Sequence, residues 1–137
     1  MSNYETLREE TLRQDGAQFP AKSFTALVLK PAYDNAREHL LGAMMEVNRA
    51  QLIMLTEQGL LTREEAKAIR RGLETLDTES LASGEYTGRY EDLFFEVEAR
   101  LLELCGDPAG SLHLARSRND MGVTMYRMVL RRCLAGV

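Results

Sequence analysis

Residue types that cross-link small proteins or bind metal ions are scarce in this chain of 137 residues. It has two cysteines, Cys105 and Cys133, and two histidines, and these four residues form no ligand cluster of recognisable spacing. No apolar run approaches the roughly 20 residues of a membrane-spanning helix. The first 14 residues are polar, without a signal-peptide pattern. We therefore expect reduced thiols, no metal, no membrane contact and a cytoplasmic location.

Basic residues are also fewer than acidic ones, and they are unevenly distributed along the chain. The formal net charge of -4 argues against nucleic acid as a partner, because binding to the phosphate backbone needs a basic surface. From Arg116 onward there are five arginines and one aspartate, so this tail carries +4 and the remainder carries -8. An anion site is therefore expected in the tail.

Apolar residues recur at steps of three and four along most of the chain, which is typical of amphipathic helices. The pattern predicts helices over residues 33–59, from the capping box of Thr62 and Glu65 to about Asp77, over residues 90–104, and from Met121 onward. No segment alternates with period two for long enough to make a convincing strand, and the only candidate, residues 24–30, is short. The predicted fold class is all-α.

Residues 1–15 carry only a weak helical stripe of Tyr4, Leu7 and Leu12. The pattern favours a frayed terminus, and the alternative is a segment that packs on a partner subunit.

The most informative stretch is Arg116-Ser117-Arg118-Asn119-Asp120, directly before the last predicted helix. Forked guanidinium donors fit a carboxylate or phosphate, and a helix N-terminus adds partial positive charge. We expect Asp120 to be the N-cap of the helix. Composition alone slightly favours the alternative, an ordinary capped helix start with solvated arginines.

The run Leu112-His113-Leu114-Ala115 followed by this stretch resembles the signature Leu-His-Thr-(Gly/Ala)-Arg-Ser-Arg-Asn-Asp of argininosuccinate lyase, in the fumarase/aspartase superfamily. Two weaker similarities occur in the same order. Residues 58–62 resemble the family's Gly-Leu-(Leu/Ile)-Thr/Ser segment, and Glu91-Asp92 with Glu98-Ala99-Arg100-Leu101 resembles its Glu-Asp segment. The resemblance implies an N-terminal arm at 1–32, a helical lyase domain at 33–112, and at 113–137 the signature loop with the start of a central-bundle helix.

The resemblance also implies a chemistry, the β-elimination that splits argininosuccinate into arginine and fumarate in arginine biosynthesis, without metal or organic cofactor. The family's substrate contact carries over to Asn119, and more loosely to Ser117, Arg118 and Arg116. His113 and Asp120 carry over as supporting residues. In the family the enzyme is a homotetramer whose active sites combine regions of different subunits.

Two departures from the family pattern concern the substrate. Lys30 and its neighbours stand where the family has a serine-containing stretch, and Phe94 stands where it has a pocket histidine. The family's later Thr-His pair and mobile loop with the catalytic serine have no counterpart here. We therefore expect this chain alone to be inactive and to hold no catalytic residue. The alternatives are a related lyase that releases fumarate from another amino-succinate, and a non-catalytic helical interaction module.

Overall fold

The computed structural model describes residues 3–16 and 19–136, and within these ranges it contains helices and no strand. The all-α prediction is thus confirmed. In chain order the helices are α1 (Asn3–Asp15), α2 (Lys22–Phe24), the π-helix η1 (Thr25–Leu29), α3 (Lys30–His39), α4 (Leu41–Glu57), α5 (Arg63–Thr75), α6 (Thr78–Ser83), α7 (Leu93–Cys105), α8 (Pro108–Ser111) and α9 (Arg118–Ala135).

The predicted helix at 33–59 is two helices, which is a correction to the sequence reading. The break lies at Leu40, where φ is −110° and ψ is −17°. Tyr33 of α3 contacts Tyr86 and Glu96. It belongs to the same buried cluster as Met44 and its neighbours on α4. Because the apolar pattern continues across Leu40, periodicity alone did not reveal the break.

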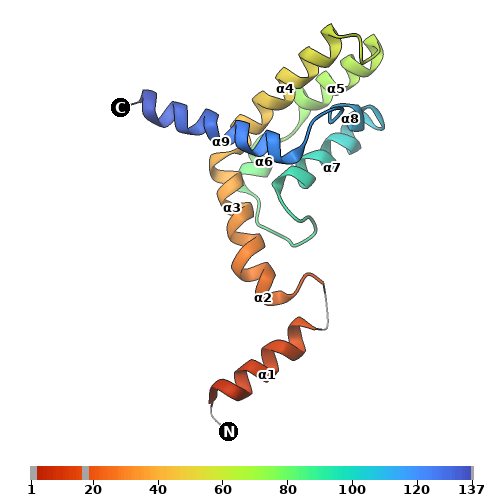
Figure 1. Cartoon of the computed structure of the whole chain (residues 1–137). Helices are drawn as coiled ribbons and strands as arrows, with labels where there is room; N and C mark the ends of the chain where they lie inside the picture. Colours follow the sequence, from red (N-terminus) through yellow and green to blue (C-terminus); the bar gives the residue numbers. More distant parts are fainter. Residues whose placement is uncertain (1–2, 17–18, 137) are drawn as a thin grey trace.

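The one weak strand candidate, residues 24–30, is helical, since these residues continue from α2 through η1 into α3. A strand needs a neighbouring strand to pair its backbone groups, and a helix satisfies them within itself. Residues 3–15 form α1 rather than a frayed terminus. Figure 1 shows α1 projecting from the base of the molecule, away from the other helices.

Side-chain caps set where the helices begin. The capping box of α5 is confirmed, with Thr62 Oγ1 accepting a hydrogen bond from Glu65 N at 3.2 Å and Glu65 Oε2 accepting from Thr62 N at 2.8 Å. Asp77 caps α6, so the second predicted helix ends early, at Thr75. Asp92 accepts from Phe95 N at 3.1 Å, so α7 begins at Leu93 and not at Tyr90.

The core lies around α5, which packs against α4, α7 and α8 (Figure 1). Its fully buried apolar side chains are Leu55, Ile69, Leu81, Leu93, Val97, Leu101 and Leu112. Gly72 allows α5 and α7 to approach closely, because a Cβ there would lie 3.1 Å from Cys105 Sγ. This packing fixes the position of α7 and of the chain that leads from α8 to α9.

Helix α9 packs on α4 through Met121 and Met125, which are buried. Arg132 extends this contact with hydrogen bonds of 2.7 Å to both carboxylate oxygens of Glu46. The remaining side of α9 exposes four large apolar residues, Val123, Tyr126, Leu130 and Leu134. In the described ranges no helix combines the length and apolar character needed to cross a membrane.

Candidate functional site

The loop of residues 113–117 runs from buried Leu112 to the start of α9. Ala115 has a positive φ of 54°, which non-glycine residues rarely adopt, so the loop makes a tight left-handed turn there. Two contacts hold the turn: Gln51 of α4 donates to the Leu114 carbonyl at 3.0 Å, and Arg116 N donates to the His113 carbonyl at 3.2 Å. These contacts therefore fix the position at which the signature residues begin.

His113 and Arg116 turn inward from this loop. Arg116 Nη2 donates to His113 Nδ1 at 2.7 Å, and His113 Nε2 lies 3.5 Å from a carboxylate oxygen of Glu98 on α7. Within the described ranges, Arg116 Nε and Nη1 are buried without a hydrogen-bond partner. The inner side of the loop is therefore a small polar cluster whose hydrogen bonding is incomplete.

Burial and the neighbouring Arg116 lower the pKa of His113 to about 4. The geometry agrees, because a ring nitrogen that accepts from a guanidinium carries no proton of its own. His113 is therefore neutral at pH 7, with its proton on Nε2 towards Glu98. Burial also lowers the pKa of Arg116, partly offset by Glu98.

Ser117 is the N-cap of α9, and the prediction that Asp120 caps this helix is wrong. Ser117 has extended backbone angles and its Oγ accepts from Asn119 N at 3.2 Å. Helix α9 thus begins three residues earlier than the cap prediction required, and Asp120 lies in its first turn. A carboxylate there still complements the partial positive charge of the helix N-terminus.

Arg118 lies across the N-terminal end of α7. Its Nη1 donates to Asp92 Oδ2 at 3.2 Å, its Nη2 lies 3.6 Å from Glu91 Oε1, and its guanidinium stacks 4.9 Å from the centroid of the Phe95 ring. Asp92 thus caps α7 with one oxygen and binds Arg118 with the other. This guanidinium is not a freely solvated charge, since two carboxylates already lie against it.

Asn119 and Asp120 are exposed on the first turn of α9. The structure therefore divides the five predicted residues into two groups. Arg116 points inward to His113, whereas Ser117, Arg118, Asn119 and Asp120 lie at the helix start, where a small anion in solution can reach them.

The two departures from the family pattern lie in different places. The Phe94 ring packs edge-on against His113, with 5.0 Å between ring centroids, and so belongs to the wall of the signature loop. Lys30 lies far along the chain from that wall, pairs with Asp34 at 2.5 Å and lines a separate hollow of about 380 Å³. None of the residues lining this hollow comes from the signature loop.

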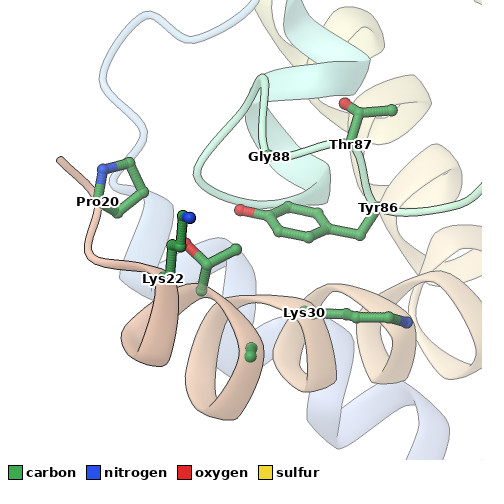
Figure 2. Close-up of a pocket in the computed structure, with 8 residues that line it drawn as sticks. Pro20, Lys22, Lys30, Tyr86, Thr87 and Gly88 are labelled. Atoms are coloured by element: carbon green, nitrogen blue, oxygen red, sulfur yellow. The ribbon is translucent and has the colours of Figure 1, made fainter. Parts of the chain in front are cut away.

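Figure 2 shows that hollow between α2 with η1 and the loop at 86–88. The Tyr86 ring reaches across it towards Lys22, while Lys30 points away along the helix. Tyr86 Oη donates to the Tyr90 carbonyl at 3.1 Å, and Lys30 is held by its ion pair. The two lysines therefore do not converge on one point.

Sequence reasoning did not identify the residues that hold the signature side chains. These residues lie at the start of α7 or on it: Glu91 precedes the cap, Asp92 is the cap, and Phe95 and Glu98 belong to the helix. They contact Arg118 or His113. Glu91, Asp92 and Glu98 belong to stretches already noted as family-like, but nothing local in the sequence connected them with the loop. No three His, Cys, Asp or Glu side chains of the described ranges are grouped so that they could hold a metal ion.

Comparison with known proteins identifies relatives. The chain is 39% identical over 121 residues to argininosuccinate lyase 2 of Agrobacterium fabrum, which covers 87% of this chain and 24% of that protein. It is 45% identical over 89 residues to argininosuccinate lyase of Hyphomonas neptunium, which covers 64% of this chain and 19% of the relative. The chain thus spans a quarter or less of these proteins. No protein-family model and no solved structure matches it. The resemblance found in the sequence is confirmed.

Proposed function

Because this chain is a relative of the argininosuccinate lyases, which are carbon–nitrogen lyases, we propose that it forms one region of a composite lyase active site. The reaction is the β-elimination that converts argininosuccinate into arginine and fumarate. Since the chain spans about a quarter of its relatives, the base and the remaining substrate contacts belong to regions outside these 137 residues.

One observation carries the proposal: the intact Ser117-Arg118-Asn119-Asp120 block begins α9 and is exposed there. A helix start needs a cap, but it does not need an arginine and an asparagine beside that cap. Arg118 is also held in place by Asp92 and Phe95, so its guanidinium has a defined position beside that cap. The arrangement suits a carboxylate ligand at the end of α9.

The chemistry gives these residues a defined task. Removal of a proton next to a carboxylate places a second negative charge on that group, so donors aimed at its oxygens stabilise the transition state more than the ground state. The Asn119 amide and the Arg118 guanidinium supply such donors, and the N-terminus of α9 adds partial positive charge. Asp92 and Glu91 keep Arg118 in place and reduce the net charge that it offers.

A second candidate substrate follows from Phe94. In place of the imidazole that the family's pattern has at this position, the wall beside His113 is an apolar ring. A lyase that releases fumarate from a different amino-succinate is therefore the alternative. The succinyl end of this substrate would bind at Asn119, as proposed for argininosuccinate. Its leaving group would contact the Phe94 ring, which is less polar than an imidazole.

We further propose that the whole protein is a cytoplasmic homo-oligomer, a tetramer as in the family pattern, and that this chain by itself is inactive. The exposed stripe of Val123, Tyr126, Leu130 and Leu134 on α9 supports oligomerisation, because its members recur at helical spacing. A contiguous apolar stripe of this kind is typical of an interface.

The test extends the gene's reading frame beyond the codon for Val137 and measures fumarate release from argininosuccinate by ultraviolet absorbance. In an active extended protein, Asn119→Ala should lower kcat by roughly 10²-fold or more, the loss expected for one donor to a developing oxyanion. The matched control is Asn35→Ala, because Asn35 is also exposed on a helix, α3.

Three results would contradict the proposal. The first is an Asn119→Ala protein that retains its activity. The second is an extended protein that releases no fumarate from any amino-succinate tested, which would favour a non-catalytic helical module. The third is fumarate release by the 137-residue chain alone, which would show that the missing regions are not needed.

A further inference from the structure

Helix α1 exposes an apolar side that its own chain does not cover. Tyr4, Leu7 and Leu12 are 74%, 57% and 59% exposed, and at 3.6 residues per turn they fall within one half of the helix circumference. An isolated helix of 13 residues is only marginally stable in water, so α1 gains stability from packing against another surface.

The C-terminal end of α1 is fixed to the domain. The Asp15 carboxylate accepts from Ser23 N at 3.0 Å and from the Ser23 hydroxyl, which links the end of α1 to α2. From this point α1 projects outward, as Figure 1 shows. The helix is therefore held in a position from which it can reach a second molecule.

A groove of matching character lies at the other end of the domain, along the seam of α4 and α5. Two adjoining hollows of about 470 and 300 Å³ share Leu52, Ile53 and Arg70 and form what we call the α4–α5 groove. Its apolar lining consists of Leu52, Ile53, Leu61, Ala66 and Leu73. Ile53 is 58% exposed, so the groove offers apolar surface to a helix.

The groove is basic at its edges. Arg49 lies on the α4 side, and Arg63, Lys67 and Arg70 lie on the α5 side, against two lining carboxylates, Glu57 and Glu74. Lys67 pairs with Glu64 and Arg70 with Glu74 at the surface, but Arg49 and Arg63 form no ion pair within residues 3–16 and 19–136. Unpaired cations on both edges favour an acidic helix.

Helix α1 carries acidic residues beside its apolar side, where they could face the basic edges of the groove. It carries four carboxylates against two guanidinium groups, and Glu9 and Glu10 lie on opposite flanks of its apolar side. A helix laid in the groove with Leu7 against Ile53 would thus bring one carboxylate towards each basic edge. Helix-in-groove recognition of this kind combines apolar anchors with flanking charge pairs.

We propose that α1 of one copy of this chain docks in the α4–α5 groove of a second copy. The α1 and the groove of a single chain lie at opposite ends of the molecule (Figure 1), so the contact joins two molecules. Each copy has one arm and one groove, and a twofold pair uses both. This inference does not depend on the proposed catalytic function.

The first test is carbodiimide cross-linking of the full chain, prepared as an equal mixture of light and heavy isotope-labelled protein. The reagent joins carboxylates to amines, and Lys67 is the only lysine in the groove, the others being Lys22 and Lys30. We expect a cross-link between Glu9 or Glu10 and Lys67 that joins a light chain to a heavy one.

Variants then test the apolar part of the contact. Leu7→Glu and Ile53→Glu should each lower the yield of this cross-link. Each should also lower the association constant of the dimer at least about tenfold, because each places a charge in a buried apolar contact. Leu104→Glu on α7 is the matched control, since Leu104 is 49% exposed and lies outside both surfaces.

A charge exchange tests the polar part. Glu10→Lys alone should weaken dimerisation, and Glu10→Lys combined with Lys67→Glu should restore it, with the cross-link now joining Lys at 10 to Glu at 67. A dimer that persists unchanged in Leu7→Glu would overturn the proposal and assign association to the α9 stripe. Cross-links of α1 only to Lys22 or Lys30, or only within one chain, would overturn it as well.

Discussion

The interior around α5 and the loop of residues 113–117 are built in opposite ways. In the interior, Leu55 and Ile69 are fully buried, and their contacts are apolar. In the loop, Ala115 adopts a positive φ and Arg116 buries two nitrogens without hydrogen bonds in the described part of the chain. The interior gains its stability mainly from buried apolar side chains, with Asn48 as a buried polar residue among them, whereas the loop holds polar groups in arrangements that cost free energy.

This contrast supports the proposed position of the site at the start of α9. Strained backbone, incompletely satisfied polar atoms and a shifted pKa occur together at functional sites more often than in structural cores. Here they occur in the loop that precedes the Ser117-Arg118-Asn119 block, and α7 supplies the carboxylates that hold it. Changes in the interior should therefore act on stability, and changes at the helix start should act on ligand binding.

The largest stability effect is expected in the interior. Leu55→Ala should lower the free energy of unfolding by about 2 to 5 kcal/mol, because it leaves a cavity at a fully buried site. Urea denaturation followed by circular dichroism measures this change. Leu60→Ala is the control, since Leu60 is 53% exposed and should lose less than about 0.5 kcal/mol. Equal losses in the two variants would mean that Leu55 is not part of a tightly packed core.

The second effect is a dependence of stability on pH, which is expected from His113 in the loop and not from the apolar interior. The folded-state pKa of His113 is about 4 against 6.5 for the free side chain, so below pH 6.5 the unfolded chain binds a proton that the folded chain does not. Stability contributed by neutral His113 is fully present above pH 6.5 and is lost as the pH falls towards 4. The loss should amount to roughly 3 kcal/mol, because each pKa unit corresponds to about 1.4 kcal/mol.

The measurement is the free energy of unfolding of the wild-type chain and of His113→Asn between pH 7 and 4. Asparagine cannot titrate, and its side-chain oxygen can still accept from Arg116, so the variant should lose less stability over this range. His39→Asn is the matched control because His39 is exposed on α3, and it should keep the wild-type profile. Identical profiles for wild type and His113→Asn would show that the cluster does not hold His113 neutral.

The third effect separates two roles of one side chain. Ser117→Ala should cost about 1 kcal/mol of stability through loss of the α9 cap, similar to Thr62→Ala at α5. Ser117→Asp keeps a cap and should keep the stability. Its added negative charge beside Arg118 should weaken binding of succinate, measured by NMR titration. If Ser117→Asp binds succinate as tightly as wild type, the anion does not bind at this helix start.

The smallest effect concerns the pair of Glu91 and Arg118, whose charged atoms are 3.6 Å apart at the surface. Glu91→Gln should change the free energy of unfolding by less than about 0.5 kcal/mol, since solvent screens such pairs. Chemical denaturation at low and high salt measures the change. A loss above 1 kcal/mol that disappears at high salt would mean that α7 and α9 depend on this ion pair.

Local signals predicted the helices well and their boundaries less well. The capping box at Thr62 fixed the start of α5, because cap chemistry depends on residues three apart. The break at Leu40 and the cap at Ser117 were not predicted, since both depend on which neighbour each segment packs against. Several residues could have capped α9, and the cluster of Ser117, Arg118, Asn119 and Asp120 did not indicate which one does.

The sequence by itself determined the helical class, the kinship with argininosuccinate lyases and the identity of the block that begins α9, because periodicity and a contiguous motif are local properties. Only the tertiary structure decided which way each signature side chain points. Arg116 turns inward to His113, and Arg118 lies against Asp92, 26 residues earlier in the chain. The contact of Arg118 with Asp92 arises because the start of α9 lies over the N-terminal end of α7, and neither local spacing nor composition specifies that placement.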